Sequence, residues 1–115
     1  MEIDRDKELS KIKRQFNKIL KQVPEDKKPI AESLIKELTF MTLTLDELKE
    51  QLKETGTVEL FKQGKQEFMR ESPALKAYNT TVQRYSLLYK QLTDLLPKVE
   101  QDIQENALYE FIKAN

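Results

Sequence analysis

The chain has no cysteine, no histidine and no tryptophan, and only two glycines and four prolines among 115 residues. Without cysteine there is no disulfide framework and no thiolate nucleophile or zinc ligand. Without histidine, the usual proton shuttle at neutral pH and the commonest metal ligand are both missing. No run approaches the roughly 18 apolar residues of a membrane span, and residues 1–4 have no signal-peptide character. These absences predict a cytoplasmic protein without a cofactor or metal.

Charge is abundant but balanced. Charged residues make up 35% of the chain and hydrophobic residues 38%, and twenty basic side chains offset twenty acidic ones. A net charge of zero produces no overall field that would indicate a partner. The length is that of one ordinary domain, so we expect residues 1–115 to form a single helical domain. Because no serine has a histidine to activate it and no glycine-rich phosphate loop is present, we expect a protein that is not an enzyme.

Apolar residues recur at steps of three and four along most of the chain, which predicts an all-α fold. We expect an amphipathic helix at about 5–23, followed by a long antiparallel hairpin of helices at about 29–55 and 73–96. Two heptad seams define that hairpin. Together they present more apolar surface than one hairpin and one flanking helix would bury, which favours a homo-oligomer. The seam residues are Leu34, Leu38, Met41, Leu45, Leu48, Leu52, Leu75, Tyr78, Val82, Tyr85, Tyr89 and Leu92.

Local signals place the ends of these helices. Asp26 is a plausible N-cap for the second helix, Gly56 a natural residue to follow its end, and Ser72 an N-cap for the third. Residues 39–45 partly alternate polar and apolar, but a strand there would interrupt the heptads on both sides. A break in the helix is the remaining alternative, since Thr44 begins a capping-box pattern that could start a new helix. A continuous helix is favoured over a kinked one because the seam keeps its phase.

Two shorter segments complete the expected fold. Residues 57–71 are too many for a bare loop, and their apolar residues indicate a short helix at 58–70 that Gly64 loosens. Another short helix is expected at 100–113. The tail 98–115 has a net negative charge and is a candidate for binding a partner through a terminal apolar group: Leu108, Tyr109, Phe111 and Ile112.

The first helix carries the clearest candidate interface. On a helical wheel its cations gather within an arc of about 80°, opposite the apolar stripe and free of acidic residues. This face suits the phosphate backbone of duplex DNA, an anionic membrane surface or an acidic protein, and it also suits a helix face that is merely solvated. No helix-turn-helix is evident, so we expect any DNA contact to lack sequence selection. The five residues are Lys7, Lys11, Arg14, Lys18 and Lys21.

Three stretches carry a family resemblance: residues 23–28 (VPEDKK), 56–64 (GTVELFKQG), and 72–79 (SPALKAYN) with its continuation to Pro97. Together they resemble small prophage proteins of Gram-positive bacteria described as phage terminase small subunits. The resemblance implies a DNA-packaging factor in the host-cell cytoplasm that oligomerises through a central helical hairpin. It also implies contact with viral DNA and, through the tail from Lys98, with the large terminase subunit. The alternative is a structural helical adaptor or scaffold of phage assembly that does not bind nucleic acid.

Overall fold

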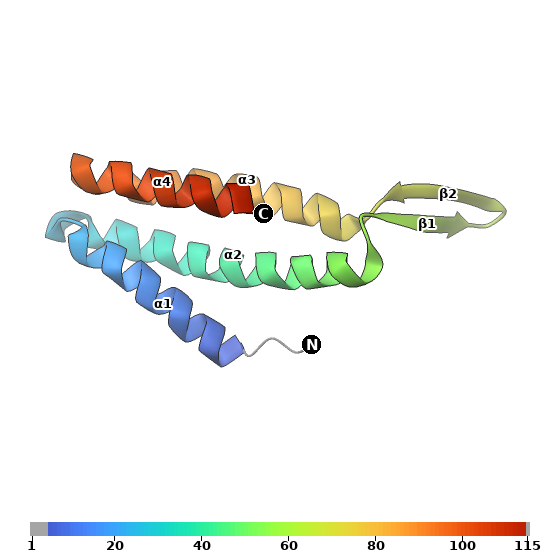
Figure 1. The fold of residues 1–115 in the computed structure, drawn as a ribbon, viewed down its shortest axis with the longest axis horizontal. Helices are drawn as coiled ribbons and strands as arrows, with labels where there is room; N and C mark the ends of the chain where they lie inside the picture. The colour runs from blue at the N-terminus through green and yellow to red at the C-terminus, as the bar shows by residue number, and fades with distance from the viewer. Residues whose placement is uncertain (1–4, 115) are drawn as a thin grey trace.

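The computed structural model describes the backbone of residues 5–114, which forms an elongated, mostly helical molecule of 61 × 26 × 24 Å. Helices α2 and α3 run antiparallel, with α1 beside α2 and α4 beside α3 (Figure 1). A two-stranded sheet projects from the end of the α2–α3 pair where the chain passes between these helices. The elements are α1 (Arg5–Gln22), a 3₁₀ turn (Glu25–Lys27), α2 (Lys28–Thr55), β1 (Val58–Gln63), β2 (Gln66–Glu71), α3 (Pro73–Thr93) and α4 (Lys98–Ala114).

The junction between α1 and α2 differs from its prediction in one detail. Helix α1 ends just before Val23-Pro24, as expected, because the residue before a proline avoids helical backbone angles. Asp26, the predicted N-cap of α2, instead lies inside the 3₁₀ turn, and Lys27 occupies the cap position without a side-chain cap bond. Pro29 sits in the first turn of α2, where its missing N–H leaves no donor unsatisfied.

Helix α2 is continuous from Lys28 to Thr55, so the favoured continuous helix is confirmed and no break occurs at Thr44. Its threonines are compatible with the helix because their hydroxyls donate to carbonyls one turn back. Thr39 Oγ1 lies 2.7 Å from the Ile35 oxygen, and Thr42 Oγ1 lies 2.9 Å from that of Leu38. Gly56 follows the last turn with a φ of 79°, a backbone angle that favours glycine.

The helix predicted at 58–70 is wrong, since this segment is an antiparallel β-hairpin. Strands β1 and β2 pair in full register, with Phe61 opposite Phe68 and a two-residue loop, Gly64-Lys65, between them. Gly64 has a φ of 59°, which suits the first position of a type II′ turn. Opposite charges across the ribbon also favour pairing, as Arg70 Nη2 lies 2.6 Å from Glu59 Oε1.

The second half of the helical hairpin follows its predicted signals closely. Ser72 caps α3, accepting a hydrogen bond of 3.1 Å from the Ala74 N–H. Helix α3 ends at Thr93, three residues earlier than predicted, and tighter turns lead on to Pro97. Helix α4 begins at Lys98, slightly before the predicted start.

Most residues of the predicted heptad seams belong to the core of a single chain. Five of the twelve seam residues are buried and the other seven are half-buried. Nine of the twelve pack in one cluster with apolar residues of α1, and Leu108 and Phe111 of α4 lie against it. The other three, Leu48, Leu52 and Leu75, lie outside this cluster, towards the β-hairpin. The buried seam residues are Leu38, Leu45, Tyr85, Tyr89 and Leu92.

Candidate functional site

Helix α1 presents its cations outward while its apolar stripe holds it to the rest of the bundle. Ile12, Phe16 and Ile19 are buried. The opposite side carries the predicted basic face, whose members are all exposed and span about 21 Å of helix. The structure therefore places together all five residues of this face: Lys7, Lys11, Arg14, Lys18 and Lys21.

Three of the five cations surround one surface hollow. Arg14, Lys18 and Lys21 line an open depression of about 390 Å³ together with Asn17 and Leu20. All five lining residues belong to α1, so the three cations can reach an anionic group from the same side of this helix. This C-terminal half of the basic face is therefore the strongest candidate contact for a phosphate.

Lys11 lies in a different electrostatic setting. It acts on the carboxylate of Asp46 in α2, whose pKa is raised mainly by burial and also by Glu8 and Glu50. Lys49 and, more weakly, Lys11 oppose that increase in the Asp46 pKa. The acidic neighbours reduce the positive potential around Lys11, so it is a weaker candidate for binding an external anion than Lys18 or Lys21. A helical wheel of α1 alone could not show this, because Asp46 belongs to another helix.

A pocket of about 340 Å³ lies among all four helices. Its walls include the rings of Phe16, Tyr85, Tyr89 and Phe111, and no charged side chain lines it. Burial raises the pKa of Tyr85 and raises that of Tyr89 to about 12. Both phenols are therefore protonated at neutral pH and cannot act as bases. Tyr89 donates a hydrogen bond of 2.8 Å to Gln104 Oε1.

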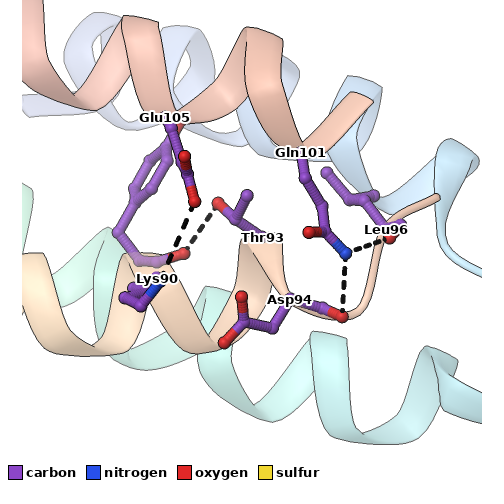
Figure 2. A network of polar contacts seen from close by, with 7 residues as sticks. Lys90, Thr93, Asp94, Leu96, Gln101 and Glu105 are labelled. Atoms are coloured by element: carbon purple, nitrogen blue, oxygen red, sulfur yellow. Dashed lines mark hydrogen bonds and ion pairs between the residues drawn. The ribbon is translucent and has the colours of Figure 1, made fainter. Parts of the chain in front are cut away.

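Polar contacts attach the start of α4 to the end of α3 (Figure 2). Gln101 Nε2 donates to the backbone oxygens of Leu96, at 2.6 Å, and Asp94, at 3.3 Å. One turn further along α4, Glu105 lies 3.8 Å from Lys90 Nζ. The two Gln101 hydrogen bonds satisfy carbonyls that the end of α3 would otherwise leave without partners.

The structure divides the predicted apolar group of the tail. Leu108 and Phe111 pack against the core, and the Phe111 ring stacks on Tyr85 at a centroid distance of 5.1 Å. Tyr109 and Ile112 are exposed, at 64% and 39%. Tyr109 and Ile112 are therefore the more accessible half of the group, whereas Leu108 and Phe111 are half-buried.

Sequence reasoning missed the exposed apolar residues of the hairpin, because it placed them in a helix. Val58, Leu60 and Met69 are 49%, 51% and 62% exposed. Alternation of apolar and charged residues around Gly64-Lys65 was the available signal.

Neither a metal centre nor a membrane span is found in the part of the chain that the structure describes. Within residues 5–114, no three carboxylates come close enough together to hold a metal ion. No helix there combines the length and apolar character needed to cross a bilayer. Comparison with protein-family models, curated proteins and solved structures finds no match to this chain.

Proposed function

We propose that the protein is a non-enzymatic DNA-packaging factor of the terminase small-subunit type, in which α1 contacts duplex DNA and copies of the chain associate. The observation that carries the proposal is the basic face of α1, whose five cations are all exposed on one side of one helix. The likeness of residues 23–28, 56–64 and 72–97 to prophage terminase small subunits supports the same function.

The dimensions of α1 suit contact with a phosphate backbone. Phosphates follow one another at about 3.4 Å per strand along the duplex axis, so a face of about 21 Å can meet several of them. Binding through Arg14, Lys18 and Lys21 alone would give a slope of about −2.7 for log K against log salt, since each neutralised phosphate adds about −0.9. The sequence shows no helix-turn-helix signature, so we expect the binding to be independent of DNA sequence.

The proposal includes two protein partners. The resemblance supports association of several copies and contact with a large terminase subunit. Four apolar residues of the predicted tail are exposed on α4 and can make the second contact: Val99, Ile103, Tyr109 and Ile112.

The test is anisotropy of a labelled DNA duplex titrated with the protein at several salt concentrations. The substitutions Arg14→Gln, Lys18→Gln and Lys21→Gln, combined in one variant, should weaken binding at least about tenfold and remove most of the salt slope. The control combines Lys53→Gln, Lys76→Gln and Lys113→Gln, which remove the same charge from exposed positions on α2, α3 and α4. The control should bind nearly as the wild type does.

Two further outcomes sharpen the assignment. Lys11→Gln should weaken binding less than Lys18→Gln, because Lys11 acts on Asp46 within the chain. Equal affinity of the α1 triple variant and the wild type would overturn the assignment of the DNA contact.

A structural adaptor without nucleic-acid binding is the second candidate. The zero net charge of the chain and the exposed apolar residues of the hairpin favour it. Absence of any complex between the wild type and duplex DNA at low salt would select this function over the first.

A further inference from the structure

The pocket among the four helices has its entrance between α1 and α4. Of the eleven residues that line it, only Gln15 on α1 and Ala107 on α4 are exposed, and the others are buried or half-buried. Behind this entrance, α2 contributes Thr42 and α3 contributes Tyr85 and Tyr89. A small molecule can therefore reach the interior of the bundle from solvent by passing between α1 and α4.

Four aromatic rings form a continuous series along the wall of the pocket. The ring centroids of Phe16 and Tyr89 lie 6.4 Å apart, and those of Tyr89 and Tyr85 lie 5.8 Å apart. Phe111 continues the series, at 5.1 Å from Tyr85. Aromatic rings attract one another at such separations through offset or edge contacts. A planar aromatic molecule would extend this series, whereas an aliphatic molecule of equal size would gain only from its burial.

The polar groups of the pocket are few, and two of them are engaged within the chain. The Tyr89 hydroxyl donates to Gln104 Oε1 at 2.8 Å. The Thr42 hydroxyl donates to the Leu38 carbonyl of its own helix at 2.9 Å. At the entrance, the carboxamide of Gln15 can both donate and accept a hydrogen bond. The pocket thus offers a ligand mainly apolar contact, with polar contact concentrated near the entrance.

The charges around the pocket favour an uncharged ligand. No charged side chain lines the pocket, so a charged ligand would leave water without an opposite charge to meet. Lys49 lies over the Phe111 ring, with Nζ 5.9 Å from the centroid, but is not part of the lining. Its positive charge disfavours a second cation at that ring.

The size of the pocket indicates the size of the ligand. A cavity of about 150 Å³ admits one benzene ring, so a pocket of about 340 Å³ suits two fused rings. The lining covers two turns of α1, from Ile12 to Ile19, and two turns of α4, from Gln104 to Phe111. Two turns of an α-helix about 10 Å wide would fill roughly 800 Å³. A helical peptide is therefore too large for this pocket.

We propose that the pocket between α1 and α4 binds a small, uncharged aromatic molecule of about two fused rings, which lies among Phe16, Tyr85, Tyr89 and Phe111. Gln15 is placed to bind one polar group of that molecule at the entrance. The inference goes beyond the proposed function. It requires neither DNA contact nor association of copies, because a single chain forms the whole pocket.

The first test is titration of the wild type with indole, a two-ring molecule without charge. The chain has no tryptophan, so indole emission, excited beyond the absorption of tyrosine, reports the ligand alone. Indole should bind with a dissociation constant of about 1 mM or lower, and its emission should shift to shorter wavelength as it leaves water. Absence of saturable binding would overturn the inference.

Two matched pairs of probes test the preference for an uncharged ligand. Indole carboxamide and indole carboxylate, substituted at the same ring carbon, have nearly the same shape and differ in charge. The carboxamide should bind at least about tenfold more tightly, because no cation lines the pocket to pair with the carboxylate. Quinoline should likewise bind at least about tenfold more tightly than the cation N-methylquinolinium. Equal affinities within either pair would contradict the proposed class of ligand.

A variant with Gln15→Phe and Ala107→Phe tests the position of the entrance. Rings from both sides would narrow it, so affinity for indole should fall at least about tenfold. The control, Gln83→Phe with Ala77→Phe, makes the same two changes at exposed positions of α3 that do not line the pocket. The control should bind indole as the wild type does. Unchanged affinity in an entrance variant whose circular dichroism matches that of the wild type would refute the assigned site.

Aromatic NMR signals of the wild type locate the bound indole without any substitution, so the inference stays testable even if the entrance variant fails to fold. The ring signals of Phe16, Tyr85 and Tyr89 should shift as indole is added. Those of Phe61 and Phe68, which pair in the β-hairpin at 5.1 Å, should not shift and serve as an internal control. Shifts at the hairpin rings without shifts at the pocket rings would place the ligand elsewhere and overturn the inference.

Discussion

The helical body and the β-hairpin contain apolar residues in similar proportion but use them differently. In the body, Leu38 and Leu92 are fully buried, whereas in the hairpin Leu60 and Met69 remain more than half exposed. Amphipathic helices find matching stripes on one another within the chain. A two-stranded ribbon has one layer, so its second face stays open unless something outside covers it. Apolar content alone therefore does not indicate which part of a chain is core.

The largest expected effect separates these two regions by truncating a leucine in each. Leu38→Ala should lower the free energy of unfolding by about 2–5 kcal/mol, because it leaves a cavity in a closed core. Leu60→Ala should lower it by less than about 1 kcal/mol, since the side chain is already half solvated. Urea unfolding followed by circular dichroism measures both. Equal losses would mean that the hairpin packs as part of the core.

A smaller effect concerns alkaline pH and is confined to the body. Burial raises the pKa of Tyr89 from 10.0 to about 12, so the folded state binds the phenolic proton more tightly than the unfolded state does. The resulting stability is complete below pH 10 and is lost as pH rises through about 12. Tyr89→Phe should cost about 0.5–1.5 kcal/mol at pH 7 by removing the bond to Gln104.

Above pH 10 the Tyr89→Phe variant should lose less further stability than the wild type, in unfolding curves measured at a series of pH values. Identical slopes in the two proteins would show that Tyr89 titrates as an exposed phenol. The hairpin contains no tyrosine, so its amide signals should not report this titration.

Much of the body could be predicted because its signals repeat. Six apolar positions at alternating steps of three and four predicted the inward side of each long helix, and Ser72 and Gly56 marked helix ends by chemistry that acts locally. The hairpin could not be recognised from periodicity in the same way. Its strands are six residues each, and runs that short fit a helical or an extended pattern equally well.

The features of the candidate site also fall into two groups, those that a single helix determines and those that tertiary packing determines. The basic face of α1 depends on one helix and its wheel, so the sequence could predict it. Two other features arise only when separate helices pack together. One is the effect of the Asp46 carboxylate on Lys11, and the other is the pocket lined by Phe16, Tyr85 and Phe111. Their positions are set by tertiary packing, which no local pattern encodes.

Amide hydrogen exchange, followed by NMR in dilute and concentrated samples, tests the central claim most directly: the helical seams close within one chain, and the hairpin lies outside their core. We expect seam amides of α2 and α3 to exchange slowest, at rates independent of protein concentration. Hairpin amides should exchange far faster than the seam amides, because most hairpin residues are exposed. Seam protection that disappears on dilution, or a dilute hairpin as protected as the helices, would contradict the account.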